Sequence, residues 1–205
     1  MTGISHRQCT AFEGFELIES GDLRDVAVKT KGVLKRGEKA PVLIFDDVTS
    51  EQIELDFRGS TADLLARIDA LPTNESPTDD TVINTDDSPR GRGRPRLGVV
   101  AREVTLLPRH WEWLGTQPGG ASVALRKLVE EAKRANKGKD DVRQAQESAY
   151  RFLSALAGNL PGFEEATRAL FKNDATRFEE LIAHWPNAVR QHASKLAARS
   201  FITQE

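Results

Sequence analysis

The chain has 205 residues, 39% of them hydrophobic and 29% charged, which is enough for one large core or for two to three small ones. Its net charge is −2, and no apolar run approaches the ~20 residues that span a bilayer, which excludes a membrane-spanning helix. The single cysteine, Cys9, excludes an intrachain disulfide and a cysteine-rich zinc site. The N-terminus has no signal-peptide pattern, so we expect a cytoplasmic protein.

Residues 1–72 predict a small α/β domain. Strand-like runs occur at QCTAFEG, PVLIFDD and EQIELDF, and the turn residues DVTS between the last two favour a β-hairpin. The spacing of apolar residues predicts one helix that ends before Gly37 and a second that begins after Ser60 and stops at Pro72. The expected order is therefore strand, helix, strand, strand, helix.

Residues 73–98 are poor in apolar side chains and rich in Pro, Gly, Ser, Thr and Asp, which is typical of a disordered linker. The first part, residues 73–87, has 5 Asp or Glu and no Lys or Arg. Residues 90–134 then hold 10 Lys or Arg against 4 Asp or Glu, a local net charge of +6. Because a polyanion responds to the local field, this segment favours a nucleic-acid partner.

The basic end of this linker, SPRGRGRPRLG, resembles the AT-hook, whose core is a Gly-Arg-Pro unit flanked by basic residues. The matching residues are Arg90, Arg92, Gly93, Arg94, Pro95 and Arg96. The resemblance implies that the arginines around this core enter the narrow, negative minor groove of AT-rich DNA, while the first of them contacts a phosphate. The alternative is a basic linker that only keeps the chain in solution.

Residues 99–136 predict a strand, a short helix, a turn and a second helix. The stretches VTLLP, RHWEWL, GGAS and VALRKLVEEA, in this order, resemble the ribbon-helix-helix fold of DNA-binding proteins. That resemblance implies a dimer whose paired strands lie in the major groove, with Arg102 contacting DNA from the ribbon. It also implies that the backbone amides of Gly120, Ala121 and Ser122, where the second helix starts, bind a phosphate.

The register of the strand before Pro108 stays open. Alignment with the family turns Leu107 inward and Arg102 outward, whereas the apolar pair Val104 and Leu106 favours the opposite faces, and a slip of one residue exchanges them. It also stays open which part of the protein buries the apolar side chains of this segment. About 35 residues bury too little surface to be stable alone, so either a second copy of the chain or the C-terminal helices must cover them.

The remaining residues predict short helices joined by short loops, which is typical of an antiparallel helical bundle. Apolar stripes with helical spacing run through residues 142–156, FEEATRALF, DATRFEELIAHW and NAVRQHASKLAARSF. We therefore expect an α+β protein. Its parts are a small N-terminal α/β domain (1–72), a disordered linker (73–98), a ribbon-helix-helix-like segment (99–136) and a C-terminal helical bundle (137–205).

No catalytic constellation is recognisable in the sequence. The chain has no Gly-rich phosphate loop with a lysine, no nucleophile elbow and no metalloprotease helix motif. His6 and Cys9 have no second pair of metal ligands, and capping or core packing explains His184 and His192 better than ligation does. We expect no enzymatic activity, no cofactor and no metal site.

The chain as a whole is similar to a bacterial family classed as a domain of unknown function. The similarity lies in PVLIFDD, WEWLGTQPGGASVALRKLVEEA, AGNLPGFEEATRALF and HWPNAVRQHA, and it implies a bacterial cytoplasmic protein. The residues themselves favour a DNA-binding protein, as a dimeric transcriptional regulator or a nucleoid-associated factor that prefers AT-rich DNA. The alternative is a non-catalytic protein-interaction or effector-sensing module with an incidental basic linker.

Overall fold

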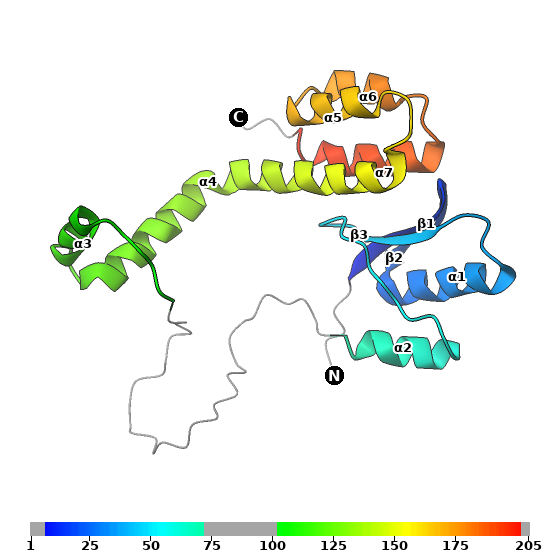
Figure 1. Ribbon diagram of the computed structural model, residues 1–205, viewed down its shortest axis with the longest axis horizontal. Coiled ribbons are helices and arrows are strands. Elements are labelled where there is room, and N and C mark those ends of the chain that lie inside the picture. Colours follow the sequence, from blue (N-terminus) through cyan, green and yellow to red (C-terminus); the bar gives the residue numbers. More distant parts are fainter. Residues whose placement is uncertain (1–6, 72–101, 202–205) are drawn as a thin grey trace, which may run out of the picture. The chain divides into compact units, whose positions relative to one another are not determined.

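The computed structural model describes residues 7–71 and 102–201, which divide into two compact units. Unit 1 holds residues 7–71 and 136–201, and unit 2 holds residues 102–135. The described residues form a three-stranded antiparallel sheet and seven α-helices (Figure 1). The mixed α+β class predicted from the sequence is thereby confirmed.

The sheet of unit 1 is built on its central strand. Strand β1 (Gln8–Glu13) pairs with β2 (Glu16–Asp22) on one edge and with β3 (Val42–Asp46) on the other, in the order β2-β1-β3. Both pairings are antiparallel, and a β-bulge interrupts the register with β2 between Ala11 and Phe12. Strands flank β1 on both sides and apolar clusters pack on both faces of the sheet, so every residue from Cys9 to Glu13 is buried.

The expected hairpin at PVLIFDD and EQIELDF is wrong in its second strand. After β3 the chain turns back and makes only one isolated bridge, between Phe45 and Gln52. The true hairpin joins β1 to β2 through a turn at Gly14, whose φ of +57° suits glycine and whose amide donates to the carbonyl of Pro41 at 2.9 Å. Strand β2 escapes sequence recognition because it is an exposed edge strand with polar residues at most positions.

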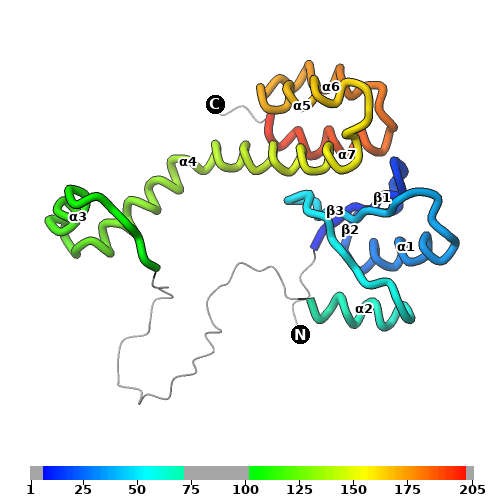
Figure 2. Tube along the Cα trace, viewed as in Figure 1, coloured from blue at the N-terminus to red at the C-terminus, as the bar shows by residue number. Residues whose placement is uncertain are grey.

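Two capped helices cover one face of the sheet (Figure 2). The carboxylate of Asp22 accepts from the amide of Arg24 at the start of α1 (Leu23–Arg36), and Ser60 forms a capping box with Asp63 at the start of α2 (Thr61–Asp69). Both helices were predicted. With the sheet they bury one apolar cluster: Cys9, Ala11, Leu23, Val26, Ala27, Ile44, Leu64 and Ile68.

The irregular segment between β3 and α2 lies over this cluster. Ile53, Leu55 and Phe57 pack against it from alternate positions, which gives the sequence its strand-like period of two. The amide of Ile53 still donates to the carbonyl of Ile44 in β3 at 2.8 Å, but beyond it side chains hold the backbone. The buried ammonium of Lys31 donates to the carbonyls of Phe57 and Gly59 at 2.6 and 2.8 Å.

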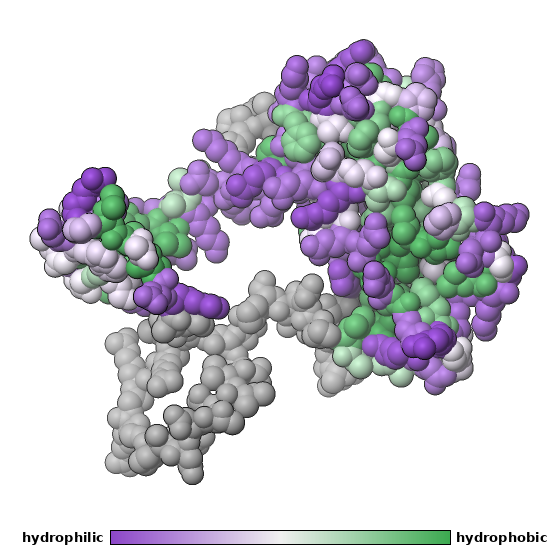
Figure 3. Space-filling view, in the orientation of Figure 1, coloured by the Kyte–Doolittle hydropathy of each residue, from purple (hydrophilic) through white to green (hydrophobic). Residues whose placement is uncertain are grey.

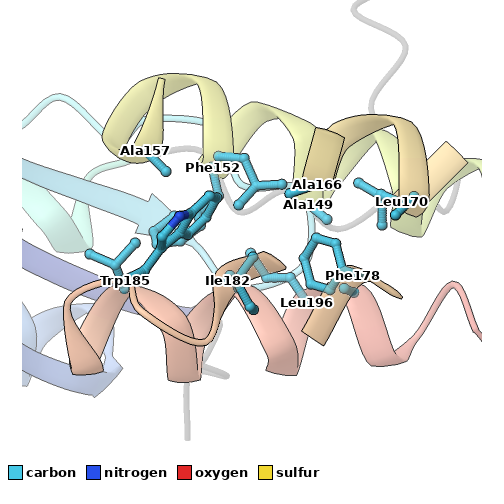
Figure 4. Close-up of a cluster of buried hydrophobic side chains, with 14 of the residues drawn as sticks. Ala149, Phe152, Ala157, Ala166, Leu170, Phe178, Ile182, Trp185 and Leu196 are labelled. Atoms are coloured by element: carbon cyan, nitrogen blue, oxygen red, sulfur yellow. The ribbon is translucent and has the colours of Figure 1, made fainter. Parts of the chain in front are cut away.

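The C-terminal helices cover the opposite face of the sheet. Helix α4 (Gly120–Phe152) passes into a turn of π-helix, η1 (Leu153–Ala157), and is followed by α5 (Phe163–Phe171), α6 (Ala175–Ile182) and α7 (Asn187–Ala198). Their apolar side chains point toward one another (Figure 4). The buried residues labelled there are Ala149, Phe152, Ala157, Ala166, Leu170, Phe178, Ile182, Trp185 and Leu196.

Residues from both ends of the chain share this second core. Phe12 and Phe45 of the sheet belong to the same buried cluster as the helical side chains, and their rings contact that of Phe152 at centroid distances of 5.5 and 5.3 Å. A buried hydrogen bond of 2.9 Å joins the hydroxyls of Ser50 and Ser148, which are 98 residues apart. Unit 1 is thus assembled from the first and last predicted segments together.

Helix α4 is longer than the sequence indicated. The second helix predicted for residues 99–136 and the first helix of the predicted bundle are one continuous helix. No proline lies between them, and a single glycine, Gly138, is tolerated inside a helix at a cost of about 1 kcal/mol. The shorter α3 (Pro108–Gly115) starts with proline at its first position, as predicted.

Candidate nucleic-acid interface

Unit 2 is a helical hairpin with an excess of cationic side chains. Helix α3 and the first four turns of α4 are joined by a short turn, in which Gly119 and Gly120 have φ values of +84° and +76°. Residues 102–135 contain six Lys or Arg and four Asp or Glu. The six cations are all exposed, and they are Arg102, Arg109, Arg126, Lys127, Lys133 and Arg134.

None of these six cations forms an ion pair with another described residue. Every ion pair between described residues lies in unit 1, for example Arg7 with Asp46 at 2.7 Å and Lys195 with Asp47 at 2.7 Å. Many cations of unit 1 are therefore paired with carboxylates, whereas the six cations of unit 2 face solvent. An unpaired cation can meet a phosphate without first losing a partner.

Of these six cations, the sequence pattern pointed only to Arg102 as a DNA contact. Four others lie on α4 as two pairs seven residues apart, Arg126 with Lys133 and Lys127 with Arg134, which places them along one side of the helix. The spacing of seven was visible in the sequence. The length of the helix that makes the spacing meaningful was not.

The strand of the ribbon-helix-helix resemblance is not confirmed. Residues 102–107 belong to no strand within the described part of the chain, and residues 99–101 lie outside it. Leu107 has extended backbone and caps α3 without a side-chain hydrogen bond. Since a ribbon of this kind pairs strands from two chains, a single chain offers no partner for the segment, and its register stays a prediction.

The predicted phosphate clamp lies at the start of α4. The helix begins at Gly120, so Ala121 and Ser122 lie inside its first turn. The amide of Gly120 donates to the carbonyl of Gln117 at 2.9 Å in the preceding turn. The amides of Ala121 and Ser122 lie in the first helical turn, where N–H groups have no intrahelical acceptor and favour an anion.

The AT-hook-like residues Arg90, Arg92, Gly93, Arg94, Pro95 and Arg96 lie outside the described residues. Their assignment to DNA therefore stays a prediction. In sequence, five residues separate the last of these arginines from Arg102, where the described residues of unit 2 begin.

Cys9 and His192 are titratable residues of unit 1 that are buried in its interior. Burial, assisted by the carboxylate of Asp47, raises the pKa of the Cys9 thiol to about 12 and so keeps it protonated and unreactive. His192 packs against the rings of Phe12 and Phe152, at centroid distances of 5.5 and 4.6 Å. Within residues 7–71 and 102–201, no three His, Cys, Asp or Glu side chains are grouped so that they would hold a metal ion.

No helix in the described parts of the chain is both long enough and apolar enough to cross a membrane. The cytoplasmic location expected from the sequence stays a prediction.

Comparison with known proteins gives the chain its family. No curated protein and no solved structure matched it. One family model, "Uncharacterized protein conserved in bacteria (DUF2239)", matches residues 8–197, which include all of unit 2 and most of unit 1. The domain-of-unknown-function family suggested by the sequence is thereby confirmed, and the chain belongs to the bacterial family DUF2239.

Proposed function

We propose that this protein binds duplex DNA, with a preference for AT-rich sequence, through residues 90–135. The observation that carries the proposal is the separation of the cations. Those of unit 2 are exposed and form no ion pair with a described residue, whereas every ion pair between described residues lies in unit 1. Residues 90–134 carry a net charge of +6 in a chain of net charge −2, so the rest of the chain carries −8. A DNA phosphate backbone is attracted to this segment.

The proposal gives the arginine-rich stretch and unit 2 different tasks. Arg92, Arg94 and Arg96 enter the minor groove, which is narrow and most negative in AT-rich sequence, and Arg90 contacts a phosphate. The cations of unit 2 contact the phosphates nearby and set the position of the chain without reading the bases. The preference for AT-rich DNA then comes from the groove shape that the arginines sense.

Two further contacts follow from the ribbon-helix-helix resemblance. Residues 102–107 would form the ribbon only when a second chain supplies the other strand, and Arg102 would then contact the DNA. The amides of Ala121 and Ser122 would bind a phosphate at the start of α4, where the helix dipole favours an anion. Such a dimer would act as a transcriptional regulator or a nucleoid-associated factor.

The test is the affinity of the purified full chain for labelled AT-rich and GC-rich duplexes, measured by fluorescence anisotropy across a salt series. The arm variant carries Arg94→Ala and Arg96→Ala. The matched control carries Arg168→Ala and Arg177→Ala, which removes two exposed arginines that pair with glutamates in unit 1.

We expect the wild type and the control to bind AT-rich duplex more tightly than GC-rich duplex. The arm variant should bind more weakly, and its slope of log K against log salt should be shallower by about 2, because each cation withdrawn from the DNA releases about 0.9 counterion fewer. Equal binding by all three proteins contradicts the role of the arm. Absence of binding at low salt contradicts the proposal as a whole and favours the interaction-module alternative.

A further inference from the structure

The two tryptophans of unit 2 lie on opposite sides of α3. This helix turns by about 100° per residue, so Trp111 and Trp113 are about 160° apart around its axis. They are 44% and 51% exposed. Figure 3 shows apolar side chains over α3 and the start of α4, bordered by hydrophilic ones. A flat partner surface can therefore meet only one of the two tryptophans at a time.

The two tryptophans differ in their neighbours along the helix surface, which are the residues three and four positions away. Those around Trp111 include no polar side chain, and they are Leu107, Pro108, Leu114 and Gly115. Those around Trp113, within the helix and its cap, are all polar, and they are Arg109, His110 and Thr116. Trp113 is thus an exposed aromatic ring in polar surroundings, which suits a ligand that is flat and carries polar groups at its edges.

The side chains of Trp113 and Arg109 are available to such a ligand. Within residues 7–71 and 102–201, neither the indole N–H nor the guanidinium forms a hydrogen bond or an ion pair, and every contact between aromatic rings lies in unit 1. Glu112 is exposed three residues after Arg109, yet the two form no ion pair. A phosphate could therefore bind the guanidinium without displacing a carboxylate.

A nucleobase fits this surface better than an apolar partner does. The cores of protein interfaces are depleted in charged residues, and a membrane surface needs a continuous apolar side, whereas Trp113 adjoins Arg109 and His110. Any base can stack on an aromatic ring, because every base has a π-face, and a cation nearby holds the strand by its phosphates. We propose that the Trp113 ring stacks on an unpaired base of a polynucleotide strand, while Arg109 binds the adjoining phosphate.

This inference rests on the proposed function for its class of partner, nucleic acid, and extends it from duplex to unpaired bases. Inside a duplex each base is covered by its neighbours, so the stack on Trp113 needs a base that has left the duplex. Steps in which thymine precedes adenine unstack easily, and such steps are frequent in AT-rich sequence. The arginine-rich stretch and Trp113 would then act on the same stretches of DNA.

The test is the affinity of the purified full chain for labelled oligothymidylate, oligouridylate and an AT-rich duplex, measured by fluorescence anisotropy at low salt. We expect Trp113→Ala to bind the oligothymidylate about 5- to 100-fold more weakly than the wild type, which corresponds to about 1–3 kcal/mol for one stacked base. The matched control is Trp111→Ala, on the same helix and similarly exposed, which should bind as the wild type does. Weakening with oligothymidylate alone would identify the strand as DNA, and weakening with both strands would include RNA; either result supports the stack.

Tryptophan emission provides a second measurement, which decides the question if Trp113→Ala fails to fold. A base stacked on an indole quenches its fluorescence, so saturation with oligothymidylate should lower the emission of the wild type. Trp113→Phe keeps a ring on which a base can stack, and retains Trp111 and the buried Trp185 as emitters. This variant should still bind the oligothymidylate, but its emission should barely change.

Absence of oligothymidylate binding by the wild type overturns the stack. Equal affinity of Trp113→Ala and the wild type for this strand does so too, as does equal weakening by both alanine variants. If the stack fails in one of these ways while the wild type binds AT-rich duplex, the proposed function still stands. If the wild type binds the oligothymidylate through Trp113 and binds no duplex, the proposed function fails and the stack stands.

Discussion

His192 makes the stability of unit 1 depend on pH between pH 7 and pH 5. His192 is only 6% exposed, its ring packs against those of Phe12 and Phe152, and its Nε2 has no hydrogen-bond partner. Burial lowers the pKa of His192 from 6.5 to about 4, while the carboxylate of Asp47 opposes this shift and the ammonium of Lys195 adds to it. The folded protein therefore keeps this imidazole neutral at a pH where the unfolded chain protonates it.

The sign and size of the effect follow from the two pKa values. Because the folded pKa lies below the unfolded one, the full stability is present above pH 6.5 and is lost as the pH falls toward 4. One pKa unit corresponds to 1.36 kcal/mol, so about 2 kcal/mol of unfolding free energy should be lost between pH 8 and pH 5. Hydrogen bonds lower the pKa values of Glu13 and Asp46 in spite of burial, so the stability that these carboxylates contribute is present above about pH 4.5 and is lost only below it.

The measurement is urea denaturation of the wild type and of His192→Phe, followed by far-ultraviolet circular dichroism at pH 8, 6 and 5. Phenylalanine keeps a ring in the cluster and removes the titration. We expect the wild type to lose about 2 kcal/mol more than the variant between pH 8 and pH 5. Equal losses in the two proteins would refute the reasoning, because His192 would then not be the group that takes up the proton.

Three further predictions concern substitutions in unit 1, and all are measured by urea denaturation. Ser50→Ala or Ser148→Ala should each cost about 1–2 kcal/mol by leaving a buried hydroxyl unpaired, and the double variant should cost clearly less than their sum; additive losses would exclude a shared hydrogen bond. Gly14→Ala should cost about 2 kcal/mol, since φ is +57° and the new Cβ would lie 2.9 Å from that of Ala40. Gly32→Ala, on the exposed and open side of α1, should instead stabilise by about 0.5–1 kcal/mol, and a loss there would contradict the helix.

Helices whose ends carry local signals were predictable from the sequence. The side chains of Asp22, Ser60 and Asp174 each accept a hydrogen bond from a backbone amide at the start of a helix. Gly37 follows the end of α1 with a positive φ. Such caps act over three or four residues, so the order of residues contains the whole interaction.

Strand pairing was less predictable because the partner is distant or absent. Glu16–Asp22 is a strand only because β1 lies beside it, and its polar, half-exposed residues show no clear alternation. Residues 53–57 do alternate, but they cover an apolar cluster and join no sheet. Alternation reports which side of a segment is buried and does not report whether a second strand is present.

The assembly of unit 1 from both ends of the chain was outside the reach of local patterns. Phe12 and Phe152 belong to one core, yet 140 residues separate them in sequence. The candidate interface likewise has one property that the sequence shows and one that depends on the fold. Its excess of positive charge is visible by counting residues, whereas the absence of ion pairs at Arg109 or Lys133 within the described residues depends on the fold.

The most direct test of DNA binding is the salt dependence of the affinity of the wild-type chain for an AT-rich duplex. If Arg90, Arg92, Arg94 and Arg96 all contact the DNA, the slope of log K against log salt should be about −4 or steeper, and the affinity for a GC-rich duplex of equal length should be lower. A slope near zero, or no complex at low salt, would contradict the proposal that this basic segment binds DNA.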